Sequence, residues 1–309
     1  MAGPGESSGG EESARRQGPS RTAAYVTLFR AIESRRAPER RLFFDPYAEA
    51  FLDARLRRAL ELSRLPLAGR AVNAYIDRRS PGARTAVLVR TRYIDEATGA
   101  ALAAGAGQVV ILGSGYDARP YRLEALRGAR VFEVDEPATL AAKRALIAAR
   151  LGAVPAGVAM VEIDFERDDL AERLGAAGFD PTGLTFFIWE GVTGYLSPEA
   201  VDGTLRTLAG LGAPGSRVVF TYLEAGLLGG GSDPDQLGAR GTVEAVRQAG
   251  EPFRFGLDSE ELPAYLAERG FELIEQVSSA ELAARYLHPL GRRPPASPFF
   301  RIALARSAG

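Results

Sequence analysis

The chain has 309 residues, of which 46% are hydrophobic, so it is long enough for one large α/β domain with additions or for two modest domains. Its 38 basic and 39 acidic residues give a net charge of −1, which predicts neither nucleic acid nor an anionic membrane as a partner. The absence of cysteine excludes disulfides, thiolate metal sites and a cysteine nucleophile. We expect no metal site, and a small molecule or a peptide as the partner.

The first third of the chain is predicted to be helical after a short tail. Residues 1–18 are rich in Gly, Ser and Glu and lack the apolar stretch of a signal peptide, so we expect a disordered tail and a cytoplasmic protein. Between residues 19 and 106 apolar side chains recur at helical spacing, and Ala83 to Ala103 forms one long predicted helix. These residues are predicted to form a helical extension that caps the following domain.

Strand-like and helix-like segments alternate between residues 107 and 309, which favours an α/β fold with a doubly wound, mostly parallel, Rossmann-like sheet. Seven strands are predicted, at residues 109–112, 129–135, 158–163, 184–189, 216–222, 271–277 and 299–305. Residues 223–257 are too long for a simple connection. We interpret this glycine-rich segment, which contains Phe253 and Phe255, as a lid-like insertion that binds substrate.

A glycine turn follows the first predicted strand. Gly113 and Gly115 allow the backbone to turn tightly and to approach a ligand without a Cβ in the way, and Asp117 follows at once. Asp135 ends the second strand 20 positions after Gly115, where a carboxylate can accept hydrogen bonds from ribose hydroxyls. The pair predicts an adenosine-containing ligand. Because the spacing from Gly113 to Ala118 also fits a dinucleotide fingerprint, NAD and a plain strand-to-loop turn stay open at this point.

Acidic residues end four of the predicted strands. Asp117, Asp135, Asp164 and Glu190 would line the edge of the sheet where ligands of open α/β folds bind. S-adenosylmethionine offers a ribose diol, an adenine amino group and an ammonium group, all of them donors that suit carboxylates, whereas a pyrophosphate would be repelled. Any one of these acids alone fits an ordinary turn residue or helix cap equally well. Their recurrence favours S-adenosylmethionine.

Ordered motifs along most of the chain resemble a known family. They are Arg90-Thr-Arg-Tyr-Ile-Asp95, Gln108 to Leu123 with its glycine turn, Phe132-Glu-Val-Asp135 running on to Lys143, Asp164, and Glu190-Gly-Val-Thr-Gly-Tyr-Leu196. In this order they resemble the leucine carboxyl methyltransferase family. The Asp45-Pro-Tyr-Ala48 element and the segment from Gly256 to Phe271 are similar to its bacterial branch of S-adenosylmethionine-dependent O-methyltransferases associated with polyketide and other secondary-metabolite pathways.

The resemblance implies a role for each matching residue. The glycine turn, with Gly113, Ser114, Gly115 and Asp117, would hold the methionine part of the cofactor, and Asp135 with Glu133 would hold the ribose. The remaining matches are Asp164 and Phe165 beside the adenine, Glu190 near the amino group, Arg90 on the cofactor carboxylate with Arg92 as the alternative, and Tyr195 in the active site. Lys143 matches a recurring family lysine, or is a solvated helix residue.

The expected reaction is methyl transfer to an oxygen of a small acidic metabolite. A carboxylate acceptor needs no general base, which fits a chain with one histidine and no Ser-His-Asp pattern, whereas a hydroxyl acceptor would need Tyr or Asp as the base. Tyr195 is the catalytic candidate, and Tyr195, Arg254 and His288 are the candidate substrate contacts. The eukaryotic members recognise a phosphatase C-terminus, and residues 223–256 do not match their recognition segment. An NAD-dependent oxidoreductase and a non-catalytic ligand-binding protein are the alternatives, and the oligomeric state stays open.

Overall fold

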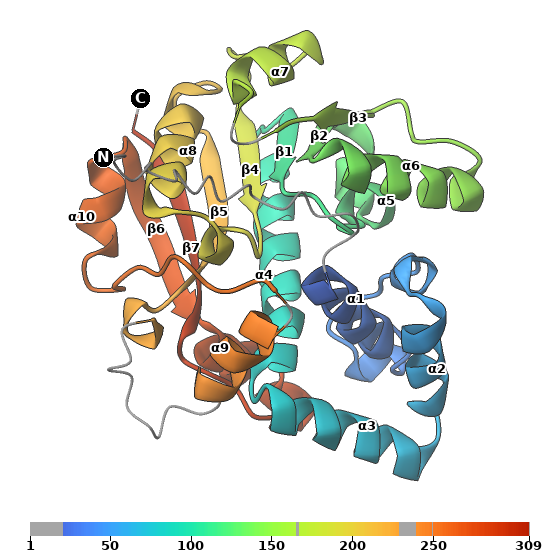
Figure 1. Ribbon diagram of the computed structural model, residues 1–309. Helices are drawn as coiled ribbons and strands as arrows, with labels where there is room; N and C mark the ends of the chain where they lie inside the picture. The colour runs from blue at the N-terminus through green and yellow to red at the C-terminus, as the bar shows by residue number, and fades with distance from the viewer. Residues whose placement is uncertain (1–20, 165–166, 229–238, 249, 309) are drawn as a thin grey trace, which may run out of the picture.

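The structure is a computed structural model that describes residues 21–164, 167–228, 239–248 and 250–308. Seven strands form one sheet in the order β3-β2-β1-β4-β5-β7-β6 (Figure 1). The strands are β1 Gln108–Leu112, β2 Arg130–Asp135, β3 Val158–Glu162, β4 Thr185–Trp189, β5 Arg217–Leu223, β6 Phe271–Ser278 and β7 Phe300–Ser307. The predicted tail, residues 1–18, lies outside the described residues.

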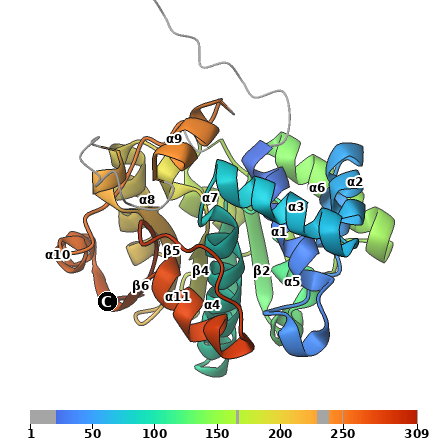
Figure 2. The same cartoon turned by 90° about the horizontal axis from the view of Figure 1, so that it is seen from below.

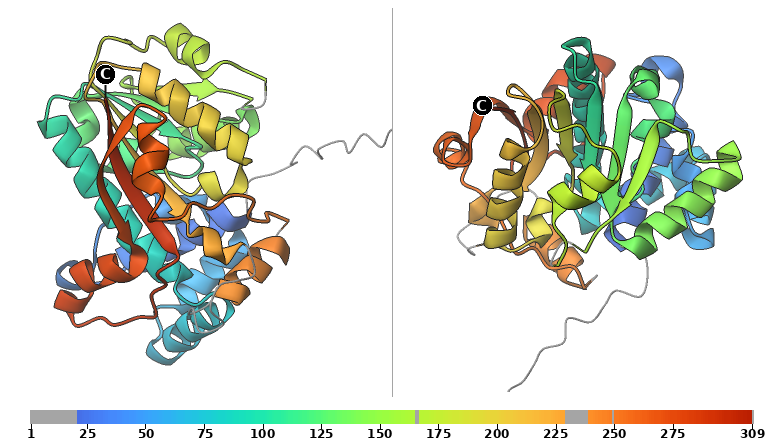
Figure 3. Two further views of the ribbon diagram at one scale, coloured as in Figure 1. Left: turned by 90° about the vertical axis from the view of Figure 1, so that its left-hand side faces the viewer. Right: turned by 90° about the horizontal axis from the view of Figure 1, so that it is seen from above.

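The sheet is parallel from β3 to β5, and β7 is antiparallel to both β5 and β6. The left view of Figure 3 shows β6 and β7 at the near edge of the sheet. This arrangement confirms the predicted doubly wound, mostly parallel sheet of seven strands. The apolar runs explain it, because all residues of β1 and β4 are buried, as strands covered on both faces must be.

Helices cover both faces of the sheet. On one face α4 (Ala83–Ala103) and α11 (Ser279–Tyr286) lie side by side, as Figure 2 shows from below, and pack Val87, Ile94 and Leu282 against Val109 and Ile111 of β1. On the other face the core joins Val110 and Leu112 of β1 to α7, α8 and α10. The further helices after β1 are α5 Arg119–Arg122, α6 Pro137–Leu151, α7 Leu170–Ala176, α8 Pro198–Gly210, α9 Ala239–Gln248 and α10 Leu262–Ala267, with short 3₁₀ turns at Glu124–Gly128, Thr193–Tyr195, Ala225–Leu227 and His288–Leu290.

Three helices precede α4, namely α1 Arg21–Ser34, α2 Ala54–Leu62 and α3 Pro66–Arg79, with 3₁₀ turns at Pro38–Arg40 and Ala48–Phe51. Leu28 and Ile32 of α1 pack against Leu56 and Leu60 of α2 in a core of their own. The helical segment expected from Asp45 is only the short turn Ala48–Phe51, because the Asp45 carboxylate accepts hydrogen bonds from the Tyr47 and Ala48 N–H groups and so fixes a tight turn. Among the described residues, no helix is both long and apolar enough to cross a membrane.

Two helices differ from the sequence expectation. Helix α11 was not expected, although Ser278 and Glu281 form a capping box at its start and thereby satisfy the first free N–H groups of the helix. Helix α9 lies within the predicted lid-like insertion, for which no helix was expected and of which residues 229–238 and 249 fall outside the described parts. The bounds of the seven strands agree closely with the predicted ranges, and those of Ala83–Ala103 coincide with them.

Candidate functional site

A cavity of about 1450 Å³ lies at the carboxyl ends of β1, β2 and β4. Its lining includes the turn after β1, Asp135 at the end of β2 and Glu190 after β4, and it is continued by residues of α1, α3, α8 and α9. The chain leaves β1 for β2 on one side and reaches β4 on the other, so this is the switch point at which open α/β sheets bind ligands. A pocket for one drug-sized ligand takes roughly 300–1000 Å³, so this cavity has room for a cofactor and an acceptor together.

In the glycine turn, residues 113–117, the backbone at Gly113 and Gly115 has a conformation that would be strained for other residues. Gly113 has φ +60° and Gly115 has φ +40°, both in the left-handed region. A Cβ on Gly113 would lie 2.5 Å from the Cγ2 atom of Val192, whereas a Cβ on Gly115 would have no atom closer than the Gly113 carbonyl oxygen at 3.8 Å. The space over Gly115 is therefore open to a ligand. The hydroxyl of Ser114 is buried, borders the cavity and has no hydrogen-bond partner in the described parts of the chain, so it suits a polar group of that ligand.

Asp135 faces the same space. One of its carboxylate oxygens accepts a hydrogen bond from the Gly115 N–H at 2.6 Å, and the other accepts one from the Glu136 N–H at 2.7 Å. Each oxygen keeps a second lone pair, so the carboxylate can still accept hydrogen bonds from a diol. Burial raises the pKa of Asp135 above its ordinary value, because the charged form is poorly solvated there.

A buried arginine that the sequence reasoning missed organises the other acids. Arg119 is 1% exposed and contacts Asp95 at 2.8 Å, Asp117 at 2.5 Å and Glu190 at 2.7 Å. Glu190 also pairs with Arg90 at 2.7 Å. Burial raises the pKa of Asp117, but the charges of Arg119, Lys143 and Arg30 outweigh burial and hold that pKa at about 2. The only signal for Arg119 was its place beside Asp117 within the quoted motif.

The pKa of Glu190 is also shifted. Burial raises it, but the charges of Arg119 and Arg90 prevail, so the pKa lies below its ordinary value. Glu190 is therefore a carboxylate at neutral pH. It lines the cavity, where it can accept hydrogen bonds from a cationic group of a ligand.

Glu133 and Lys143 lie beneath the turn and do not line the cavity. Both side chains are fully buried, and the Lys143 ammonium donates to Glu133 at 2.5 Å and to the Ser114 carbonyl at 3.3 Å. The Tyr121 hydroxyl donates to the other oxygen of Glu133. The interpretation of Lys143 as a solvated residue is therefore wrong. Glu133, predicted to hold the ribose, is occupied by two protein donors instead.

Two further predicted residues, Asp164 and Arg92, lie away from the cavity. Asp164 is exposed and pairs with Arg167 at 3.8 Å, while its neighbours Asp168 and Asp169 are the acids of this loop that line the cavity. Phe165 lies outside the described residues. Arg92 pairs with Glu96 at 2.7 Å on the surface, so of the two candidate arginines Arg90 is the one that faces the cavity.

His288 also lies outside the cavity lining. It begins the turn after α11, whereas Ser279 at the start of that helix does line the cavity. A helix of this length rises about 12 Å, which separates the two ends of α11. The expected substrate contact by His288 is therefore not supported by its position.

Part of the cavity lining is aromatic. The rings of Tyr195 and Phe253 lie 5.3 Å apart, and the Arg254 N–H donates to the Gly194 carbonyl at 2.8 Å, which holds the start of the Phe253 segment against the Tyr195 turn. All three side chains line the cavity. Phe255, also considered for substrate contact, is instead a core residue. The described residues contain no group of three or more side chains that would bind a metal.

Comparison with known proteins agrees with this site. The sequence profile of the family described as leucine carboxyl methyltransferase matches residues 23–209. A relative from Saccharopolyspora erythraea is 35% identical over 283 residues, which are 88% of this chain and 89% of the relative. Another from Mycobacterium sp. strain JLS is 37% identical over 281 residues, 87% of either chain. Both are named as S-adenosyl-L-methionine-dependent methyltransferases.

Solved structures share the fold. A DUF574 family protein from Streptomyces avermitilis superposes with a TM-score of 0.54 at 18% identity, covering 89% of this chain and 99% of its own. A Thermobifida fusca protein named as a methyltransferase has a TM-score of 0.53 at 22% identity, covering 78% and 89%. The family profile spans more than half of the sequence, from the start of α1 to the end of α8, and so includes the glycine turn, Asp135 and Glu190. The chain therefore belongs to the leucine carboxyl methyltransferase family.

Proposed function

We propose that this S-adenosylmethionine-dependent methyltransferase methylates a carboxylate oxygen of a small acidic metabolite and releases a methyl ester. The observation that carries the proposal is the Arg254 side chain, which lines the same cavity as Tyr195. Arg30, Arg90 and Arg301 line the cavity in ion pairs with Asp45, Glu190 and Glu224. Arg55 and Arg254 line it too, and in the described parts of the chain neither guanidinium has a carboxylate within 4 Å, although hydrogen bonds, and with them the charge of Arg254, lower the pKa of Glu199. An acceptor carboxylate would supply that partner.

The residues present fit the cofactor. The open space over Gly115 and the unpartnered Ser114 hydroxyl suit its methionine part, Asp135 suits the ribose, and Glu190 suits the amino group. When bound, S-adenosylmethionine supplies an electrophilic methyl group. Asp164, with Phe165, stays a prediction for the adenine, although Asp168 and Asp169 are the acids of that loop that border the cavity.

The protein's part in the reaction is mainly alignment. Arg254 and the Tyr195 hydroxyl would orient the acceptor carboxylate toward the cofactor end of the cavity. When two reactants are held in a reactive geometry, the effective concentration of one at the other can reach about 10⁵ M or more. A carboxylic acid with a pKa near 4 is already ionised at neutral pH, so no proton has to be removed. The position of His288 outside the cavity supports a carboxylate acceptor, because it leaves the lining without a histidine base.

The test uses the full chain with methyl-labelled S-adenosylmethionine and a metabolite extract. We expect a labelled product that releases methanol in mild alkali, because an ester is cleaved under those conditions. Arg254→Gln should raise the acceptor KM at least about tenfold, as expected when a hydrogen bond to a charged group is lost, while the KM for S-adenosylmethionine stays the same. Arg254→Lys should recover part of the loss.

The matched control is Arg247→Gln, which removes an arginine of α9 that pairs with Glu244 and does not line the cavity. It should leave both KM values unchanged. A labelled product that survives alkali would be an ether and would move the assignment to a hydroxyl or phenol acceptor. If calorimetry shows that NAD binds and S-adenosylhomocysteine does not, the assignment of S-adenosylmethionine as the cofactor is wrong.

Cofactor affinity should depend on pH through Asp135. Its pKa is raised above the ordinary value of about 3.9, so protonation begins at a higher pH than for an exposed aspartate. Since only the ionised form accepts hydrogen bonds at both oxygens, the affinity for S-adenosylhomocysteine should fall as the pH falls through that pKa. Calorimetry from pH 7 downward, over the range in which circular dichroism is constant, measures this.

Asp135→Ala should weaken binding at least about tenfold at neutral pH, in line with the roughly 1.5–3 kcal/mol of hydrogen bonds to a charged group, and should remove the pH dependence. A folded Asp135→Ala protein with wild-type affinity would show that the carboxylate only closes the turn.

A further inference from the structure

The glycine turn is held in place by charged side chains from three different elements. Lys143 of α6 donates to the Ser114 carbonyl, Asp135 of β2 accepts from the Gly115 N–H, and Arg30 of α1 donates to the Tyr116 carbonyl. Because glycines at 113 and 115 leave the backbone free to take other conformations, these three contacts fix its shape. Two of them come from β2 and α6, the strand and helix that follow the turn in the chain. The third comes from the helical extension, 86 residues earlier in the chain.

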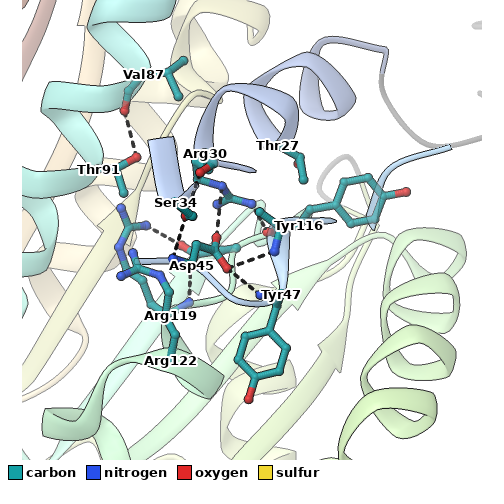
Figure 4. Close-up of polar contacts among 12 residues, drawn as sticks. Thr27, Arg30, Ser34, Asp45, Tyr47, Val87, Thr91, Tyr116, Arg119 and Arg122 are labelled. Carbon is teal, nitrogen blue, oxygen red and sulfur yellow. Dashed lines mark hydrogen bonds and ion pairs between the residues drawn. The ribbon is translucent and has the colours of Figure 1, made fainter. Parts of the chain in front are cut away.

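Arg30 is itself held by Asp45. Their side chains approach to 3.4 Å between Nε and Oδ2, with 6% and 0% of their surfaces exposed (Figure 4). Ser34 ties the two residues together, because its hydroxyl donates to the Arg30 carbonyl and accepts from the Asp45 N–H, both at 2.8 Å. The second oxygen of Asp45 caps the turn at Tyr47 and Ala48.

The contacts lead from the buried Asp45 through Arg30 to the glycine turn. Asp45 does not line the cavity, whereas Arg30 and the glycine turn do. Asp45 can therefore affect a ligand through Arg30, through α1 as a whole, or through the turn that it caps, where Phe51 stacks on Tyr116. Asp45→Asn keeps an oxygen that can accept from the Tyr47 and Ala48 N–H groups, so it removes the charge that pairs with Arg30 and leaves the cap in place. Removing Arg30 and Asp45 from water costs desolvation free energy, so a gain in stability alone does not explain this ion pair.

We propose that the Arg30–Asp45 pair is a positioning pair for the cofactor turn, and that it couples docking of α1 to cofactor binding. With the pair intact, Arg30 holds the Tyr116 carbonyl away from the open space over Gly115. With the pair broken, the turn relaxes to conformations that close this space. The proposal rests on S-adenosylmethionine binding at the turn, and it gives the Asp45-Pro-Tyr-Ala48 motif a role that methyl transfer alone does not require.

The chain offers a matched control on the same helix. Glu33 of α1 pairs with Arg292 at 2.6 Å, and its side chain is as fully buried as that of Asp45. It also accepts a hydrogen bond from the Leu42 N–H and so fixes the same neighbourhood of α1. Glu33 does not line the cavity, and Arg292 touches Glu33 and the Arg40 carbonyl rather than the turn. Asp45→Asn and Glu33→Gln therefore remove equivalent charges, and only the first one disturbs the pair that holds Tyr116.

The experiment measures binding of S-adenosylhomocysteine and of 5′-methylthioadenosine, which lacks the amino-acid carboxylate, to the full-length wild type and both variants. We expect Asp45→Asn to weaken both ligands by about tenfold and to raise the KM for S-adenosylmethionine without changing that of the acceptor. Glu33→Gln should bind both ligands within about twofold of the wild type, even though its melting temperature falls. Arg30→Lys should recover part of the affinity that Arg30→Gln loses.

Three results would overturn the proposal. Equal losses in Asp45→Asn and Glu33→Gln would mean that any loosening of α1 weakens binding. Tighter S-adenosylhomocysteine with unchanged 5′-methylthioadenosine in Asp45→Asn would mean that the released Arg30 contacts the ligand carboxylate directly. Unchanged binding of both ligands would show that the Arg30–Asp45 pair does not affect cofactor binding. A wild type that binds neither ligand would instead contradict the proposed function.

Hydrogen exchange on the wild type tests the same coupling without any variant. Binding of S-adenosylhomocysteine should protect amides of residues 21–34 and 45–48 as well as those of the glycine turn, because the bound turn stabilises the docked extension and the effect is reciprocal. Protection confined to the turn would contradict the coupling.

Discussion

Replacing Arg119 by glutamine should lower the free energy of unfolding by about 3–5 kcal/mol, the usual cost of removing one partner from a buried ion pair. Arg119 contacts Asp95, Asp117 and Glu190, and without its charge these carboxylates repel one another in a site that solvates them poorly. Urea unfolding at pH 7, followed by circular dichroism, measures the difference. Methyl transfer should be lost as well, because Asp117 and Glu190 line the cavity.

The pH dependence identifies the cause. In the wild type the pKa values of Asp117 and Glu190 lie below their ordinary values, so their stabilisation is present at neutral pH and is lost as the pH falls through those pKa values. In Arg119→Gln the arginine charge is gone, and burial raises the pKa values of Asp117 and Glu190 instead. Both carboxyl groups then bind protons in the folded state as the pH falls from 7 to 5, so the variant's deficit in the free energy of unfolding relative to the wild type should shrink. Arg206→Gln breaks an exposed pair with Asp202 and should change little. An Arg119→Gln protein as stable as this control would show that the acids do not depend on the arginine.

Replacing Gly115 by valine should weaken S-adenosylhomocysteine binding by roughly a hundredfold, the scale expected when a site is displaced by about 1 Å or filled. The φ of +40° disfavours a branched residue, and the new side chain would enter the open space where the ligand is expected. Calorimetry on the folded variant measures the loss.

Gly178 provides the control for backbone strain. It has φ +85° and no atom within 4 Å of an added Cβ, and it lies between α7 and β4 outside the cavity lining. Gly178→Val should lose stability to a similar extent, at least about 1–2 kcal/mol, yet bind the ligand normally. Normal binding by Gly115→Val would mean that the cofactor does not approach this glycine.

The fold was predictable because it is encoded in local patterns. Apolar runs such as Val109 to Leu112 can only be strands covered on both faces, and Ser197 at the start of α8 caps it by accepting from the Ala200 N–H. Strand ends follow from the same runs, so three of the four strand-end acids, Asp117, Asp135 and Glu190, were correctly expected at one edge of the sheet and line the cavity. Asp164 does not: its side chain is exposed and pairs with Arg167, whereas Asp168 and Asp169 border the cavity.

The supporting residues were not predictable in this way. Arg119, Lys143 and Arg30 act through partners 71, 10 and 86 positions away, and no local period or motif pairs such residues. Glu133 was assigned to the cofactor through the family resemblance and its closeness to Asp135, and the sequence does not show that its side chain meets the buried Lys143 instead. His288 was proposed as a substrate contact. The sequence does not show that it follows the end of α11 that lies away from the cavity.

The pairing of the last strand bears on the order in which the protein is completed during synthesis. Strand β7 lies between β5 and β6, and β6 pairs with no other strand in the described sheet. Chains emerge from the ribosome with the amino end first, so the parallel part of the sheet and its ligand-binding edge can assemble early. Strand β6 cannot pair until residues 300–307 have been synthesised. Until these residues arrive, β5 presents an open edge to other chains. The nascent protein is therefore most exposed to misassociation just before β7 leaves the ribosome.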